Sequence, residues 1–197
     1  MARFDLNDTV AVITGAAGGI GSVLCREFAT AGARVVLAGR TEQSLEAVAE
    51  EVEAEEALIV PTDIRDPSSV DSLIARSVDH FGRVDVMINN AASGTHPKKP
   101  EEVPYEEWVS QIDINLTGVF NGCLAAGRQM IRQQSGKIIN VSSTAGTKGN
   151  PGMIHYSAAK AGVLSLTNNL AYMWAEHNIC VNAVVPGLVA TPAMIAY

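Results

Sequence analysis

The amino-acid sequence predicts a doubly wound α/β fold, in which helices cover both faces of a parallel sheet. Short apolar runs alternate with longer segments of helical pattern along the whole chain. The runs are continuously apolar, as in strands that are buried on both faces. A glycine-rich segment, Gly15 to Gly21, follows the first run and opens a helical segment. We therefore expect one dinucleotide-binding domain with a Rossmann sheet of strand order 3-2-1-4-5-6.

The expected strands are short segments rich in β-branched and apolar residues, each followed by turn-forming residues. Pro186 and Gly187 end the last of them. The strands are expected at residues 9–14, 34–38, 57–60, 84–88, 137–141 and 179–185.

The segments between the strands have helical patterns and recognisable start signals. Thr41 and Asp66 stand where N-caps are expected, and Pro67 occupies a first helical position, where proline is favoured. The helices are expected from the glycine-rich turn to residue 32, and at about 41–54, 67–81, 105–134 and 153–177.

The composition and charge of the chain exclude some classes of binding partner. The chain has 197 residues, a net charge of −7 and a pI near 5.0, which gives no basic surface for nucleic acid or an anionic membrane. No apolar run approaches the ~20 residues of a membrane span. Cys25, Cys123 and Cys180 lie far apart in apolar contexts and are expected to be buried, reduced thiols. We expect a cytoplasmic protein that has no metal site and binds neither nucleic acid nor membrane.

The glycines after the first strand predict a phosphate site. Gly15, Gly19 and Gly21 allow a sharp turn and a close approach of a ligand to the backbone. The helix that begins there presents free amides and a positive dipole end to a pyrophosphate. The alternative is a tight turn between strand and helix that binds nothing.

The residue after the second strand bears on the choice of cofactor. A site that prefers NAD usually has an acidic residue there, which binds the ribose 2′-hydroxyl. This chain has Arg40 instead, and a guanidinium can bind a 2′-phosphate by paired hydrogen bonds. The sequence therefore favours NADP(H) over NAD(H). The alternatives are a solvated Arg40 or one that only stacks on adenine.

Polar residues also follow the third, fourth and fifth strands. Asp63 could accept a hydrogen bond from an adenine amino group, although capping of a turn explains it equally well. Asn89 and Ala91 belong to a polar and small-residue segment that lets a cofactor pass. Ser143 places a hydroxyl just beyond a strand end, where it would face the crevice, but serines are also common in turns.

Tyr156 and Lys160 lie one helical turn apart and share a helix face. An ammonium beside a phenol favours the phenolate and lowers the phenol pKa, so that Tyr156 could act as a general acid or base. The alternative is a surface pair without function. His155 is expected to be exposed at the start of the same helix, with a place facing the substrate crevice as the alternative.

Together these motifs resemble the short-chain dehydrogenase/reductase family, and the match runs from about residue 8 to residue 191. The glycine pattern combined with Ser143, Tyr156 and Lys160 in this order is highly specific for the family and only weakly specific for the substrate. The matching motifs are Thr14–Gly21, Asn89–Ala92, Asn115 within 113–117, Ser143, Tyr156-x-x-x-Lys160, Pro186-Gly187 and Thr191.

The resemblance implies a role for each catalytic residue. Tyr156 would exchange a proton with the substrate oxygen, and Ser143 would orient that oxygen by a hydrogen bond. Lys160 would hold the nicotinamide ribose and lower the pKa of Tyr156. Asn115 would anchor a water molecule that relays protons from Lys160. The expected cofactor contacts are Gly15, Gly19, Ile20, Gly21, Arg40, Asp63, Ile64, Asn89, Ala91, Tyr156, Lys160, Pro186, Gly187, Val189 and Thr191.

The resemblance implies an oxidoreductase that interconverts a carbonyl and a secondary alcohol with NADP(H). A 3-oxoacyl reductase or a broad-specificity ketone/alcohol dehydrogenase is the nearest subclass, and a homodimer or homotetramer is implied. The alternatives are an NAD-linked alcohol dehydrogenase and a non-catalytic regulatory protein that binds the cofactor. Family members typically extend several dozen residues beyond the position of Tyr197, so we expect a longer native protein with a seventh strand.

Overall fold

The computed structural model describes residues 5–52, 57–94, 96–191 and 195. In the described part of the chain a 6-stranded parallel sheet has the order β3-β2-β1-β4-β5-β6, which confirms the predicted fold and strand order. The strands are β1 (Val10–Thr14), β2 (Arg34–Gly39), β3 (Ala57–Pro61), β4 (Val86–Asn89), β5 (Gly136–Val141) and β6 (Ile179–Val184).

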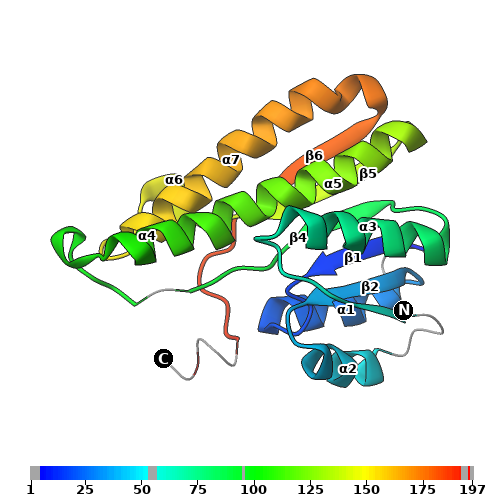
Figure 1. Ribbon diagram of the computed structural model, residues 1–197, viewed down its shortest axis with the longest axis horizontal. Helices are drawn as coiled ribbons and strands as arrows, with labels where there is room; N and C mark the ends of the chain where they lie inside the picture. Colours follow the sequence, from blue (N-terminus) through cyan, green and yellow to red (C-terminus); the bar gives the residue numbers. More distant parts are fainter. Residues whose placement is uncertain (1–4, 53–56, 95, 192–194, 196–197) are drawn as a thin grey trace.

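Helices cover the two faces of the sheet, as Figure 1 shows. One face packs against α3, α5 and α7, and the other packs against α1 and α2. The helices are α1 (Gly19–Thr30), α2 (Glu42–Glu51), α3 (Pro67–Phe81), α4 (Tyr105–Ile112), α5 (Gly118–Gln133), α6 (Ala145–Lys148) and α7 (Ile154–Trp174), with short 3-10 turns η1 (Pro100–Glu102) and η3 (Ala175–His177).

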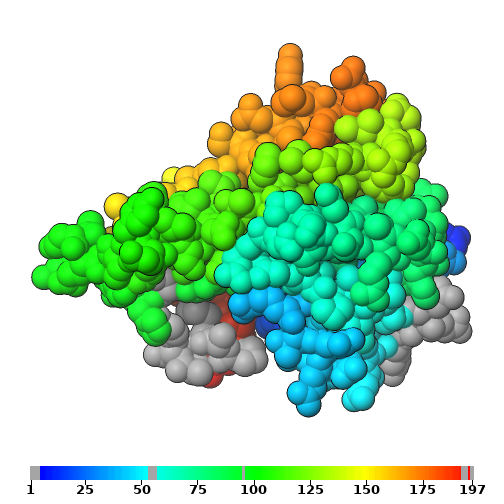
Figure 2. All heavy atoms as spheres, viewed as in Figure 1, coloured from blue at the N-terminus to red at the C-terminus, as the bar shows by residue number. Residues whose placement is uncertain are grey.

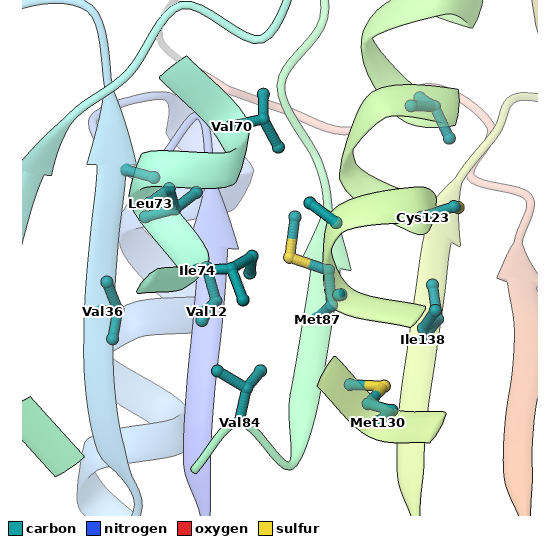
Figure 3. Close-up of a cluster of buried hydrophobic side chains, with 14 of the residues drawn as sticks. Val12, Val36, Val70, Leu73, Ile74, Val84, Met87, Cys123, Met130 and Ile138 are labelled. Carbon is teal, nitrogen blue, oxygen red and sulfur yellow. The ribbon is translucent and has the colours of Figure 1, made fainter. Parts of the chain in front are cut away.

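The larger core lies between the sheet and the helices α3, α5 and α7. Figure 3 shows Leu73 of α3 and Met130 of α5 pointing toward side chains of β1, β2, β4 and β5. Both residues are fully buried, as is Val12 of β1. On the other face, Cys25 of α1 and Leu45 of α2 are also fully buried. Each strand at the centre of the sheet is therefore covered on both sides, as its continuous apolar sequence predicted.

Several local expectations need correction. The helix expected at 105–134 is divided by a π-helical turn, η2 (Asp113–Thr117), and the short helix α6 was not expected. Thr41 stands at the N-cap of α2 but makes no side-chain capping bond, whereas the Asp66 carboxylate accepts the predicted bond from the Ser68 amide at 2.9 Å. Cys180 was expected to be buried but is exposed on β6, because no described element covers that side chain.

No helix in the described residues has the length and apolarity that spanning a membrane requires. The same residues contain no cluster of three or more potential metal-ligating side chains.

Leu73→Ala should destabilise the protein, because the fully buried side chain lies between α3 and the sheet. We expect a loss of about 2–5 kcal/mol in the free energy of unfolding, measured by urea denaturation. The matched control is Ser72→Ala, an exposed neighbour on the same helix, which should change stability by less than about 0.5 kcal/mol. Equal losses in the two variants would contradict this assignment of the core.

Candidate active site

The glycine turn between β1 and α1 leaves space at the backbone that a side chain would fill. Gly15 has a φ of +65°, and a Cβ atom there would lie 2.8 Å from the Ala91 Cα atom. A Cβ atom on Gly21 would lie 2.1 Å from the Gly15 carbonyl oxygen. Only glycine fits these two positions, and the turn leads directly into the N-terminus of α1. The arrangement fits a pyrophosphate bound at the start of the helix.

A cleft of about 510 Å³ opens beside this turn, at the carboxyl ends of the strands. It extends from the glycine turn across the ends of β2 and β3 to the segment after β4. Most of the predicted cofactor residues line it: Gly15, Gly19, Ile20, Gly21, Arg40, Asp63, Ile64, Ala91 and Thr191. The lining also includes residues that were not among the expected cofactor contacts: Thr41, Ser44, Arg65, Asn90, Ser93 and Ile114.

The far end of the cleft carries two guanidinium groups and one carboxylate. Arg40 lines the cleft, and its charge helps to lower the pKa of the Asp63 carboxyl group. The main cause of this lowered pKa is the hydrogen-bonded pairing with Arg65. The Arg65 Nη2 atom lies 2.6 Å from Asp63 Oδ2, and Nε lies 3.0 Å from Oδ1. Both oxygens of Asp63 are thus already bonded, which the sequence did not indicate.

The end of β4 is bonded to the end of β1 through Asn90. The Asn90 Nδ2 atom donates to the Thr14 carbonyl oxygen at 2.9 Å, and the backbone amides of Asn90 and Ala91 donate to the Thr14 hydroxyl. Asn90 therefore borders the cleft, whereas the side chain of Asn89 does not. Asn89 Nδ2 points into the core and donates to Asn140 Oδ1 at 2.8 Å. The adjacent asparagines have opposite directions because successive side chains of a strand alternate between faces.

Asn115 lies in the π-helical turn η2 and is fully buried. Its side-chain amide donates to the Gln111 side chain at 2.9 Å and to the Ser93 carbonyl oxygen at 3.2 Å. The Asn115 Oδ1 atom accepts from the Ser93 amide at 3.2 Å. These bonds hold the segment after β4 against the helix, and π-helical turns are frequent at functional sites.

A smaller cavity of about 200 Å³ adjoins the cleft and contains the predicted catalytic side chains. Ser143, Tyr156 and Lys160 all line it. The two cavities share Ile20, Asn90, Ala92 and Thr191, so they are parts of one site. The remaining predicted contacts after β6, Pro186, Gly187 and Val189, also line the smaller cavity.

Lys160 is buried to 1% exposure, and its ammonium group donates to the Val141 carbonyl oxygen at 2.9 Å. Burial lowers the pKa of Lys160 to about 8. The ammonium nitrogen lies 5.7 Å from the centroid of the Tyr156 ring. Burial raises the pKa of Tyr156, and a hydrogen bond with Ser143 opposes that rise. The direction differs from the expected lowering by Lys160, because burial is the larger effect on the phenol.

His155, the residue before Tyr156, does not lie where the sequence predicted. Its side chain is fully buried rather than exposed, and it does not line either cavity described above. The imidazole packs toward α4, where its Nε2 atom lies 3.1 Å from Glu107 Oε1.

Comparison with known proteins identifies the family. The sequence model of the short chain dehydrogenase family matches residues 9–196. A 3-oxoacyl-[acyl-carrier-protein] reductase of Synechocystis sp. is 41% identical over 189 residues, which cover 94% of this chain and 76% of that protein. An acetoacetyl-CoA reductase of an Acinetobacter species is 38% identical, over 95% of this chain and 77% of that protein.

The solved structures give the same result. The crystal structure of 3-ketoacyl-(acyl-carrier-protein) reductase from Brucella melitensis, complexed with NADH, matches with a TM-score of 0.93 at 32% identity. The match covers 98% of this chain and 80% of that one. Family match, sequence identity and sheet topology agree with the resemblance seen in the motifs. The chain belongs to the short-chain dehydrogenase/reductase family.

Proposed function

We propose that this protein is an NADP(H)-dependent oxidoreductase that interconverts a carbonyl and a secondary alcohol. The observation that carries the proposal is the position of Ser143, Tyr156 and Lys160 in one cavity that adjoins the glycine-turn cleft. The names of the two reductase relatives favour a 3-oxoacyl thioester as the substrate class. A cytoplasmic location fits this chemistry and the composition of the chain.

Each residue of the site would have its own role in the reaction. A nicotinamide cofactor held in the cleft would supply or accept the hydride. Tyr156 would donate a proton to the carbonyl oxygen, or accept one from the alcohol, and Ser143 would hold the same oxygen by a hydrogen bond. Lys160 has three donor hydrogens, and one is donated to Val141. The other two donor hydrogens of Lys160 are suited to the hydroxyls of a ribose. Asn115 would anchor the water molecule that relays protons between Lys160 and solvent.

The preference for NADP(H) over NAD(H) rests on Arg40. Arg40 lines the cleft beside Thr41 and Ser44, whose hydroxyls are suitable partners for a phosphate. In the described part of the chain the Arg40 side chain makes no hydrogen bond or ion pair, so its fork of donors is available to a 2′-phosphate. Asp63 would accept a hydrogen bond from adenine only with those oxygen lone pairs that its hydrogen bonds with Arg65 do not use.

We also propose a homodimer or homotetramer built on α4 and α5. These helices expose large hydrophobic side chains, as is typical of surfaces that associate. Tyr105 is 74% exposed and Phe120 is 41% exposed. Trp108 and Val109 of α4 are partly exposed as well.

Tyr156→Phe should lower kcat by about 10²–10⁴-fold, because the variant lacks the proton that Tyr156 is proposed to donate. The affinity for NADPH, measured by fluorescence titration, should change little. Turnover is measured as NADPH oxidation with 3-oxoacyl thioesters and simple ketones. Tyr172→Phe, an 88% exposed tyrosine on the same helix, is the matched control and should retain full activity. Wild-type turnover by the Tyr156 variant would refute the role of Tyr156. Cofactor binding by the wild-type protein without turnover of any substrate would favour a non-catalytic protein.

Arg40→Ala should raise the KM for NADPH by about 10–100-fold, which corresponds to the loss of a charge-assisted bond of roughly 1.5–3 kcal/mol. The KM for NADH should stay nearly the same. Steady-state kinetics with both cofactors measure the two effects. Arg128→Ala removes an arginine from an exposed ion pair with Asp71 on α3 and is the control, because neither residue lines the cleft. A wild-type protein that prefers NADH, with no change in the Arg40 variant, would overturn the assignment.

The buried ammonium of Lys160 should make stability depend on pH. Its pKa is about 8 in the folded cofactor-free protein and has an ordinary value of 10.5 when the chain unfolds. Between these values the unfolded chain binds more protons than the folded one, so this group makes stability rise as the pH rises. Lys160→Met should flatten the rise between about pH 8 and 10.5, by at most about 1.4 kcal/mol per pH unit.

Urea denaturation across this pH range measures the effect. The exposed Lys137→Met is the matched control, and its stability should run parallel to that of the wild type. Parallel curves for the Lys160 variant and the wild type would mean that Lys160 keeps its proton throughout the range.

A further inference from the structure

Each ring nitrogen of the fully buried His155 imidazole contacts a group of the described residues. Its Nδ1 atom lies 3.0 Å from the backbone nitrogen of Tyr156, and its Nε2 atom lies 3.1 Å from Glu107 Oε1. A backbone amide can only donate, so Nδ1 is the acceptor. The ring hydrogen is then on Nε2 and is donated to the Glu107 carboxylate. The geometry therefore selects one tautomer of His155.

The bond to the Tyr156 amide replaces a helix cap. Helix α7 begins at Ile154, and Met153 at its N-cap makes no side-chain capping bond. The first amides of a helix have no carbonyl partner within it. The Tyr156 amide is one of these, and His155 Nδ1 satisfies it. The first turn of α7, from which Tyr156 projects, thus depends on the imidazole for its hydrogen bonding.

Glu107 extends the connection to a third segment. Its Oε2 atom pairs with the Lys98 ammonium group. The Lys98 amide also donates to the Gly152 carbonyl oxygen at 2.9 Å, just before α7. Lys98 precedes η1 and α4, which lie at one end of the molecule (Figures 1 and 2). Lys98, Glu107 and His155, here called the His155 network, therefore connect the segment before α4, α4 itself and the start of α7.

We propose that His155 is a positioning residue for Tyr156. The Glu107 carboxylate holds His155 in the Nε2–H tautomer, and the ring then fixes the amide of Tyr156 and the direction of its phenol. Lys98 fixes Glu107 and couples it to the segment that precedes α4. This inference rests on the proposed function of Tyr156 as the proton donor, but the hydrogen-bonded network can be tested independently of any activity.

His155→Phe tests the role directly, because it keeps a ring of similar size and removes both nitrogens. We expect kcat to fall by about 10–100-fold, the scale of a misplaced reacting group, while the Kd for NADPH stays unchanged. In a Tyr156→Phe background the same change should cause no further loss, because His155 acts through the Tyr156 hydroxyl. A loss of equal size in both backgrounds, or wild-type kcat in His155→Phe, would overturn the proposal.

Variants of Glu107 keep the test valid if His155→Phe does not fold. Glu107→Gln retains an oxygen that can accept from Nε2–H and loses only the pairing with Lys98, so its kcat should fall no further than that of Lys98→Met. Glu107→Leu removes the acceptor and should reproduce the loss expected for His155→Phe. Equal kcat values for the two Glu107 variants would contradict the role of this bond. The neighbouring lysines form a matched pair: Lys98→Met should lower kcat, and Lys99→Met, which removes an exposed pair with Glu102, should not.

Nuclear magnetic resonance separates failure of the network from failure of the proposed function. Long-range ¹H–¹⁵N spectra of the wild-type protein should show the Nε2–H tautomer of His155. Glu107→Leu should keep this tautomer, because the Tyr156 amide still donates to Nδ1, but its Nε2–H should lose the signal of a hydrogen-bonded proton. A wild-type protein that turns over no carbonyl substrate, but shows this tautomer, would refute the proposed function and with it the catalytic effect, and leave the network established. An Nδ1–H tautomer in the wild type would refute the network itself.

Discussion

The buried ammonium of Lys160 is the constraint on which the site depends. A charge taken out of water is costly unless it is hydrogen-bonded, and Lys160 meets this need at the end of β5 through the Val141 carbonyl oxygen. The adjacent Ser142 hydroxyl donates to the Lys160 carbonyl oxygen at 2.8 Å. These two bonds join α7 to β5 in one register. Ser143 is the residue after Ser142, and Tyr156 lies one helical turn before Lys160. The register of α7 on β5 therefore brings both side chains to the same cavity.

Much of the fold and of the site could be predicted because the signals are local. The continuous apolar runs predicted the buried strands, and the glycines at 15, 19 and 21 predicted the turn that opens the cleft. Parallel strands place their carboxyl ends at one edge, so residues that follow different strands were expected to meet. Arg40, Asp63 and Ser143 do line the two adjoining cavities.

The parts that could not be predicted depend on contacts between distant segments. His155 is buried because Glu107, 48 positions earlier, supplies an acceptor for its ring. The pairing of Asp63 with Arg65 depends on the shape of a turn, whereas the sequence suggested only an adenine contact or a turn cap for Asp63. Whether Asn89 or Asn90 borders the cleft depends on which face of the β4 end is turned toward it. A single sequence gives the residue types at these places but not their directions.

The π-helical turn at Asp113–Thr117 has a consequence for how the chain can change. Such a turn holds one residue more than an α-helical turn. The extra residue is accommodated within the turn, so α4 and α5 keep the relative rotation of one continuous helix. Losing or gaining one residue between this turn and Cys123, where no π-helical turn absorbs the change, would rotate the rest of α5 by about 100° relative to the sheet. Met130 and Cys123 would then turn away from the sheet. Length variation of one residue among relatives should therefore be found at this turn rather than within the flanking helices.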